Sequence, residues 1–324
     1  MDNLTHSLVG ALIGQAGLKR KSGLAMPALI IGANLPDIDA ACFFWLDGVE
    51  HLAFRRGITH GPPAILLLPL VLAGLLYGYD RWQASRGKRP EKRLPVRFGW
   101  LYLLALIGCI SHPALDWLNS YGIRLLEPFS SRWFYGDVLF IIDLWLWLGL
   151  GLATWLSLRR EKRGGDWRRP ARIALSAALV YIGFNAAITW RAESNLAGVA
   201  LGSTIVATPV PVAFWQRDIV YSADDGLIYK GMATRAWSLF GGTTGPETPL
   251  SPEGPSCIEP DEVLAYADTP DLRAFLFWSR KPFVTPARDG VAVLRDARFA
   301  SPMVDDQFSV RFAVPEGAED CGFD

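Results

Sequence analysis

A histidine and an aspartate lie four residues apart in the segment Ser111 to Asp116, SHPALD, near the end of an apolar run that begins at Trp100. If this run forms a helix, His112 and Asp116 project from the same helix face. An imidazole beside a carboxylate is a standard ligand pair for a divalent metal ion. The pair therefore predicts a metal site at the end of a helix.

Other residues of metal-ligating types lie at or near the ends of further apolar runs. A single histidine in such a place is more often a surface residue or a hydrogen-bonded one, so the prediction depends on the joint pattern. Carboxylates at membrane depth cost several kcal/mol unless a partner or an ion compensates them. We expect a metal-ligand set drawn from His6, Asp37, Asp39, His60, His112 and Asp116, with Asp143 as a supporting residue or alternative ligand.

The apolar runs that must position these residues indicate a membrane domain. Two short runs, Leu4–Leu18 and Leu24–Ile38, predict an N-terminal hydrophobic helical hairpin that need not span fully. Four longer ones predict about four full spans: Pro62–Tyr79, Trp100–Leu118, Val138–Leu158 and Ile173–Trp190. In the first run the positive charges follow the apolar stretch, which is the reverse of a signal peptide, so we expect this segment to stay in the mature chain.

Basic loops give an orientation for these spans. The segments 80–97 and 159–172 each contain seven Lys and Arg residues, and the positive-inside rule makes such loops cytoplasmic. The predicted metal ligands then all lie at the outer helix ends, although none of them was used to set the orientation. Arg55 and Arg56, on the outer side, are the main departure from the rule.

The C-terminal part differs in composition from the membrane part. Residues 1–190 contain 21 Lys and Arg against 13 Asp and Glu, whereas residues 191–324 contain 11 against 19. We predict an α-helical integral membrane domain over residues 1–190, followed by a small α+β extracytoplasmic domain over residues 191–324. Strands are expected at 204–208, 214–222, 227–237, 290–299 and 307–314, a helix after Thr269 and a loop over 241–260.

Neither the cysteines nor the charges indicate a further class of site. No CxxC pair is present, which argues against a thiolate zinc site, and no basic and aromatic groove for nucleic acid is evident. Cys257 and Cys321 would suit a disulfide in an extracytoplasmic tail, and would otherwise be ordinary thiols.

Five ordered segments resemble the YdjM-like family of inner-membrane proteins, described as metal-dependent hydrolases. They are DNLTHSLVGALIG, IGANLPDID, RGITHG, SHPALDWLNSYGIRLLEPFS and YGDVLFIIDLWLW. The order of the histidines and aspartates is also similar to the zinc-dependent phospholipase C and single-strand nuclease superfamily. That resemblance implies metal-ligand positions for His6, Asp37, His60, His112 and Asp116, with Asp116 as a bridge between ions. The chain has no histidine after His112, which departs from the superfamily pattern and limits the site to one or two ions.

The predicted function is a membrane-bound metal-dependent hydrolase that acts on a phosphoester or another ester, with a lipid as one candidate substrate. Zinc is the first choice of ion, and manganese or magnesium are alternatives. Asp37 or Asp39 would act as general base, and Asn119 and Arg124 would bind substrate; Arg124 could equally be an interfacial anchor. Two alternatives stay open: a non-catalytic protein with a structural metal and a partner-binding tail, and a transporter with an intramembrane ion path.

Overall fold

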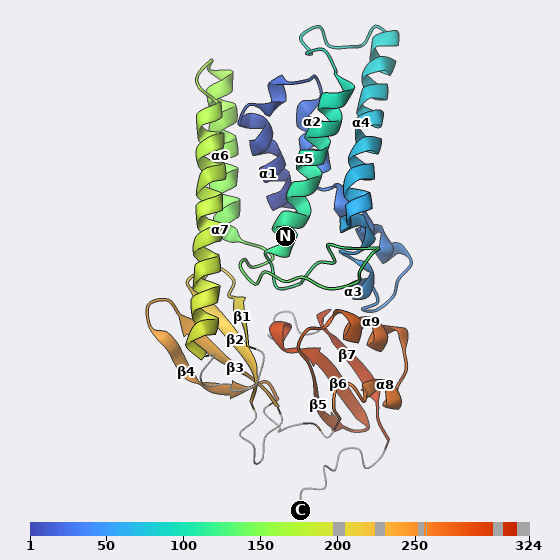
Figure 1. Ribbon diagram of the computed structural model, residues 1–324, viewed down its shortest axis with the longest axis vertical. Coiled ribbons are helices and arrows are strands. Elements are labelled where there is room, and N and C mark those ends of the chain that lie inside the picture. Colours follow the sequence, from blue (N-terminus) through green and yellow to red (C-terminus); the bar gives the residue numbers. More distant parts are fainter. Residues whose placement is uncertain (197–204, 224–230, 252–255, 257, 301–306, 316–324) are drawn as a thin grey trace, which may run out of the picture. The chain divides into compact units, whose positions relative to one another are not determined.

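The computed structural model describes residues 1–196, 205–223, 231–251, 256, 258–300 and 307–315 (Figure 1). The chain forms two compact units. One contains Met1–Asp39 and Arg56–Asn185, and the other contains Ala40–Arg55 and Ala186–Asp324. The segment 40–55, which the sequence analysis places in the membrane domain, therefore belongs with the C-terminal residues. Cys257 and Cys321 lie outside the described residues.

The first unit is helical. It is built from α1 (Asn3–Gln15), α2 (Ala25–Gly32), α4 (Pro62–Ser85), α5 (Phe98–Trp117), α6 (Leu144–Lys162) and the first part of α7 (Arg168–Leu196), with the 3₁₀ helices η1 (Leu18–Arg20) and η3 (Ile58–His60) and the start of η2 (Leu35–Phe44). Three of these helices, α4, α5 and α7, are long and apolar enough to cross a membrane. The bent pair of α2 and η2, at 52° to each other, makes a fourth span if it counts as one.

The span expected at Val138–Leu158 begins later than predicted, because α6 starts at Leu144. Residues 138–143 are not helical, since the backbone N–H groups of Val138 and Leu139 donate to the carbonyl of Leu118 at 2.8 and 2.9 Å. Asp143 then caps the helix by accepting from the N–H of Leu146 at 2.9 Å. The charged last turn begins at Arg159, so the apolar part is about 22 Å long, which is short for a hydrocarbon core of about 30 Å.

Helices α2 and α5 approach each other through two glycines. A Cβ on Gly32 would lie 2.6 Å from the carbonyl oxygen of Ala105, and a Cβ on Gly108 would lie 2.5 Å from that of Leu29. Neither position could hold a larger residue without moving the backbones apart. Buried apolar residues of α2, α4 and α5 pack around this contact: Ala25, Ala28, Leu29, Leu72, Ala73, Leu101, Leu104 and Ala105.

The second unit contains two antiparallel sheets. The first has the order β1 (Val206–Pro209), β2 (Gln216–Ala223), β3 (Gly231–Ser238) and β4 (Gly242–Pro249), and the second has the order β5 (Pro282–Arg288), β6 (Val291–Asp296) and β7 (Ser309–Ala313). The end of α7 packs on the first sheet, where Ile188 and Ala192 join Ile219 and Trp237 in one buried cluster. The expectation of a loop over 241–260 is wrong for residues 242–249, which pair with β3. Strand β5 was not predicted.

Short helices complete this unit: α3 (His51–Phe54), α8 (Val263–Tyr266), α9 (Pro270–Trp278) and η4 (Ala297–Phe299). The expected helix start at Thr269 is confirmed, because its hydroxyl accepts from the N–H of Leu272 and Pro270 takes the first helical position. The carboxylate of Asp271 also accepts from the N–H of Val49 at 2.7 Å. This bond joins the segment 40–55 to the C-terminal residues.

Candidate metal centre

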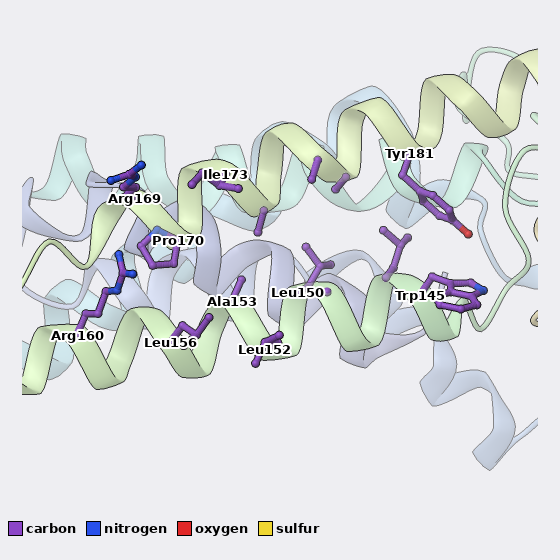
Figure 2. A pocket seen from close by; sticks show the side chains of 15 residues that line it. Trp145, Leu150, Leu152, Ala153, Leu156, Arg160, Arg169, Pro170, Ile173 and Tyr181 are labelled. Carbon is purple, nitrogen blue, oxygen red and sulfur yellow. The ribbon is translucent and has the colours of Figure 1, made fainter.

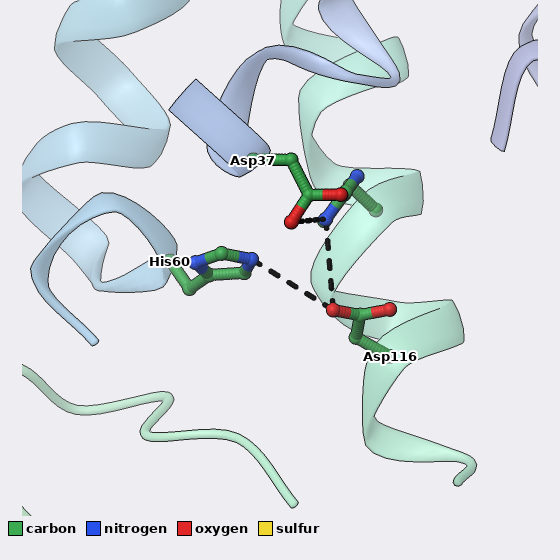
Figure 3. Close-up of side chains that lie close together, drawn as sticks. Asp37, His60 and Asp116 are labelled. Carbon is green, nitrogen blue, oxygen red and sulfur yellow. Dashed lines mark ion pairs between the residues drawn. The ribbon is translucent and has the colours of Figure 1, made fainter. Parts of the chain in front are cut away.

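Four side chains from three elements converge at the end of α5: Asp37, His60, His112 and Asp116. Asp37 lies in η2 just after the bend that follows α2, His60 ends η3 just before α4, and the other two lie one turn apart on α5. One ligand atom from each of the four lies within 4.8 Å of every other. Figure 3 shows Asp37, His60 and Asp116 pointing toward a common centre. His60, His112 and Asp116 are at most 1% exposed, and the side chain of Asp37 is 9% exposed.

The distances within this cluster fit a metal ion better than direct hydrogen bonds. Nε2 of His112 lies 3.6 Å from Oδ2 of Asp116 and 3.7 Å from Oδ1 of Asp37, and Nε2 of His60 lies 3.8 Å from the same Oδ2. In a tetrahedral site with bonds of about 2.0–2.1 Å, neighbouring ligand atoms are about 3.3 Å apart. These three pairs are therefore within a few tenths of an ångström of the spacing that a shared ion requires.

The tautomer of His112 is fixed by the backbone carbonyl of Ala33, the residue that follows α2. Its Nδ1 lies 2.7 Å from the carbonyl oxygen of Ala33. A carbonyl only accepts hydrogen bonds, so Nδ1 carries the proton and, in the neutral ring, the lone pair of Nε2 points into the cluster. This nitrogen is buried and makes no hydrogen bond within the described residues. A metal-binding histidine is held in the same way by a second-shell acceptor.

His60 is oriented by the residues beside it, not by the cluster. The hydroxyl of Thr59 donates to Oδ2 of Asp39 at 3.1 Å and lies 3.0 Å from Nδ1 of His60. Because that hydroxyl proton is used, Thr59 accepts from Nδ1, which turns Nε2 toward Asp116. Asp39 also accepts from the N–H of Arg56 at 2.7 Å. The structure thus places Asp39 behind His60, where it supports the ring, and outside the four-residue cluster.

The other oxygen of Asp116 faces a different neighbour. Oδ1 lies 3.2 Å from Nε2 of His6 and also contacts the nitrogen of Met1. The ring of His6 stacks on that of His112 with centroids 3.8 Å apart. His6 is therefore adjacent to the cluster through Oδ1, and Asp116 presents one oxygen to each side.

The remaining predicted residues have other partners. Asp143 caps α6 and accepts from the hydroxyl of Tyr181 at 2.9 Å. Arg124 pairs with Glu127 at 2.9 Å, and burial lowers the pKa of this guanidinium. Asn119 accepts from Nη1 of Arg56 at 3.0 Å through its side-chain oxygen.

Arg56 is the residue that the sequence analysis missed. It is 6% exposed, and its Nε lies 3.0 Å from Oδ2 of Asp116. Its backbone has a φ of 54°, a left-handed conformation that L-residues rarely adopt. The sequence did contain a signal for this role. Arg56 violates the positive-inside rule, because it lies on the side predicted to be outer, and it comes four residues before the predicted ligand His60.

Fold and site together define an integral membrane protein whose helices enclose a cluster of metal-ligating side chains. Residues 1–192 match the model of the YdjM inner membrane protein family, so the chain belongs to that family. The uncharacterized protein YfhP of Bacillus subtilis (strain 168) is 26% identical over 194 residues, which are 57% of this chain and 52% of that protein. The chain thus spans about half the length of this relative. No solved structure matches the chain.

Proposed function

We propose that this protein is a metal-dependent hydrolase that acts on a phosphoester or another ester, with a membrane lipid as the favoured substrate class. The observation that carries the proposal is the buried convergence of Asp37, His60, His112 and Asp116. Two imidazoles and two carboxylates suit zinc, with manganese or magnesium as alternatives. A divalent ion bound here would supply Lewis acidity and an activated water at neutral pH.

The protein's own residues would divide the remaining tasks. Asp37 is the least buried member of the cluster, with a side chain that is 9% exposed, so its carboxylate is the best placed to accept a proton from an entering water. Asp39 would hold His60 in position through Thr59, in place of the catalytic role expected from the sequence. Arg124 would bind a substrate phosphate by exchanging its ion pair with Glu127 for the substrate, and Asn119 would hold Arg56 against Asp116.

The similarity of residue order to the phospholipase C and nuclease superfamily stays a prediction. One feature favours a second ion as well: Oδ1 of Asp116 faces His6 while Oδ2 faces the four-residue cluster. A carboxylate in this position can bridge two ions. We therefore keep His6 as a candidate ligand of a second ion.

The position of the site in the membrane is part of the proposal. His60 lies just before α4 and Asp116 in the last turn of α5, whereas the basic segment 80–97 joins the other ends of these two helices. The second basic segment, 159–172, likewise follows the far end of α6. With both basic segments in the cytoplasm, the cluster and the C-terminal unit would be extracytoplasmic.

A structural metal is the second candidate, and the burial of three ligands favours it. An ion enclosed by His60, His112 and Asp116 would stabilise the fold and need no access for substrate. In this case the C-terminal unit would serve to bind a partner.

Metal analysis joined to an activity assay tests both candidates. Detergent-purified wild type should contain close to one divalent ion per chain, or two if His6 contributes, and the His112→Ala/Asp116→Ala double variant should contain none. His51→Ala is the control, because His51 lies in the other unit.

An activity assay separates the two candidates. Hydrolysis of bis(p-nitrophenyl) phosphate or of phospholipid vesicles that stops with chelator and returns with metal supports the hydrolase. A bound metal with no hydrolysis, but a lower unfolding temperature in chelator, supports the structural role. A wild type that stays empty with zinc, manganese and magnesium contradicts both.

A further inference from the structure

Helices α6 and α7 face each other across an open apolar groove of about 660 Å³ (Figure 2). Its walls include Leu146, Leu150 and Leu156 of α6 and Ile173 of α7. The volume falls within the range of about 300–1,000 Å³ that is usual for pockets of small organic ligands. This groove is separate from the metal centre, since none of its lining residues belongs to that cluster.

Small residues keep the groove open. Ala174, Ala177 and Ala178 lie along α7, and Gly149 lies opposite on α6. A Cβ on Gly149 would meet no atom of the described residues within 4 Å. The space between the helices is wide enough for a slender, flexible group such as an acyl chain.

The two ends of the groove differ in chemistry. At one end Tyr181 and Trp145 close it, and the hydroxyl of Tyr181 donates to Asp143 at 2.9 Å. At the other end lie Arg160 and Arg169, one from each helix (Figure 2). Both arginines are exposed, and neither forms an ion pair with a carboxylate in the described part of the chain. The groove is therefore apolar along its length and cationic at one mouth.

We propose that this groove binds one anionic phospholipid, with an acyl chain between α6 and α7 and the phosphate between Arg160 and Arg169. Guanidinium groups bind phosphate oxygens in pairs of parallel hydrogen bonds. Basic pockets between membrane helices are a recurrent mode of anionic lipid recognition. Along α6 the groove runs from Trp145 to Arg160, about 22 Å at 1.5 Å per residue, which exceeds the half-thickness of a hydrocarbon core of about 30 Å.

A lipid fits both features of the groove, whereas a membrane helix of a partner would fill the apolar part and leave the two arginines unmatched. The cationic end of the groove, where the phosphate would bind, lies at the opposite end of the first unit from the metal centre. Its neighbours there are Lys19 and Glu161, which form an ion pair, while the metal ligands lie at the end of α5. The proposal therefore does not depend on hydrolase activity.

Native mass spectrometry of the detergent-purified full chain tests the cationic mouth. Wild type is incubated with dioleoylphosphatidylglycerol or with dioleoylphosphatidylcholine, and the fraction that retains one lipid is measured. We expect a clear preference for phosphatidylglycerol and a weakening of about 10- to 30-fold in Arg160→Gln/Arg169→Gln, at about five-fold per arginine. Arg159→Gln/Arg163→Gln is the control, because it removes the same charge from residues that do not line the groove. Equal losses in both double variants would reduce the effect to net charge and overturn the proposal.

A groove-filling variant tests the apolar part. Gly149→Leu should abolish retention of both lipids, since the new side chain occupies the groove. Gly151→Leu should behave as wild type, because Gly151 also has open space around a Cβ but does not line the groove. Both changes raise helix propensity, so neither should disturb α6. Unchanged lipid retention in Gly149→Leu overturns the proposal. So does a loss of dimer in place of a loss of lipid, which would assign the groove to a second copy of the chain.

Discussion

The guanidinium of Arg56 and the carboxylate of Asp116 form a buried ion pair at the metal centre, with Nε 3.0 Å from Oδ2. The same oxygen is the one that His60 and His112 face. A metal ion bound there would share this oxygen with the arginine. Arg56, together with the nitrogen of Met1, therefore compensates the charge of Asp116 in the absence of metal. In the presence of metal, Arg56 would compete with the ion for Oδ2.

This ion pair predicts that one substitution lowers the stability of the metal-free protein and strengthens the stabilisation by zinc. In Arg56→Met, Asp116 loses its buried guanidinium partner and keeps the contact with the nitrogen of Met1, and we expect the metal-free protein to lose up to about 3–5 kcal/mol of stability. Added zinc should restore much of this loss, because the ion has no competitor. Thermal unfolding in chelator and in zinc measures both effects. Arg55→Met, which changes the adjacent arginine in the other unit, should show neither effect. A variant that is as stable in chelator as wild type would show that the pair contributes nothing.

The two neighbouring aspartates should differ in their effect on metal affinity. Asp37→Asn replaces an anionic ligand with a neutral amide and should abolish stoichiometric binding. Asp39→Asn weakens the support of His60 and should cost about 10- to 100-fold in affinity. Competition with a chromophoric chelator measures both affinities. The reverse order would place Asp39 in the coordination sphere and Asp37 outside it.

Metal affinity should also depend on the glycine contact between α2 and α5. A methyl group at Gly108 would force the backbones apart and lengthen the bond from Nδ1 of His112 to Ala33. We expect Gly108→Ala to lower metal affinity about 10-fold or more, the scale of losing a second-shell partner. Gly99→Ala is the matched control on the same helix, since a Cβ there meets no atom within 4 Å in the part of the chain that the structure describes. Equal affinities in the two variants would show that the close approach does not position His112.

The C-terminal unit should lose stability at acid pH through one buried aspartate. Burial by itself would raise the pKa of Asp296, but the guanidinium of Arg298 at 2.8 Å outweighs it and holds this pKa below its ordinary value. The stabilisation is therefore fully present above about pH 4 and is lost as the pH falls through the lowered pKa.

Thermal unfolding of wild type and Asp296→Asn between pH 7 and pH 3 checks this. The unfolding temperature of the variant should be lower at neutral pH, and the difference should shrink as the pH falls. Asp289→Asn, at an exposed turn, should match wild type throughout. A difference that stays constant down to pH 3 would rule out titration of Asp296 as its source.

The sequence by itself predicted the features of local structure that depend on residue type and on the spacing of apolar residues. Apolar length predicted α4, α5 and α7, the i to i+4 spacing predicted that His112 and Asp116 share a face, and Thr269 with Pro270 predicted the start of α9. These features depend on short stretches of chain, in which the local pattern and the solvent decide the structure. The order of the five segments also pointed to the family that the whole membrane part matches.

Only the tertiary structure decided which polar residues meet. Asp37 and Asp39 are two residues apart, yet the 3₁₀ geometry of η2 sends one into the cluster and the other behind His60. Arg56 reaches Asp116 across sixty residues of sequence, and β4 forms against β3 in a stretch rich in glycine, proline and threonine. Such contacts depend on the bend after α2, the glycine approach of α2 to α5 and the pairing of strands. These are long-range packing choices that no local pattern of residues specifies.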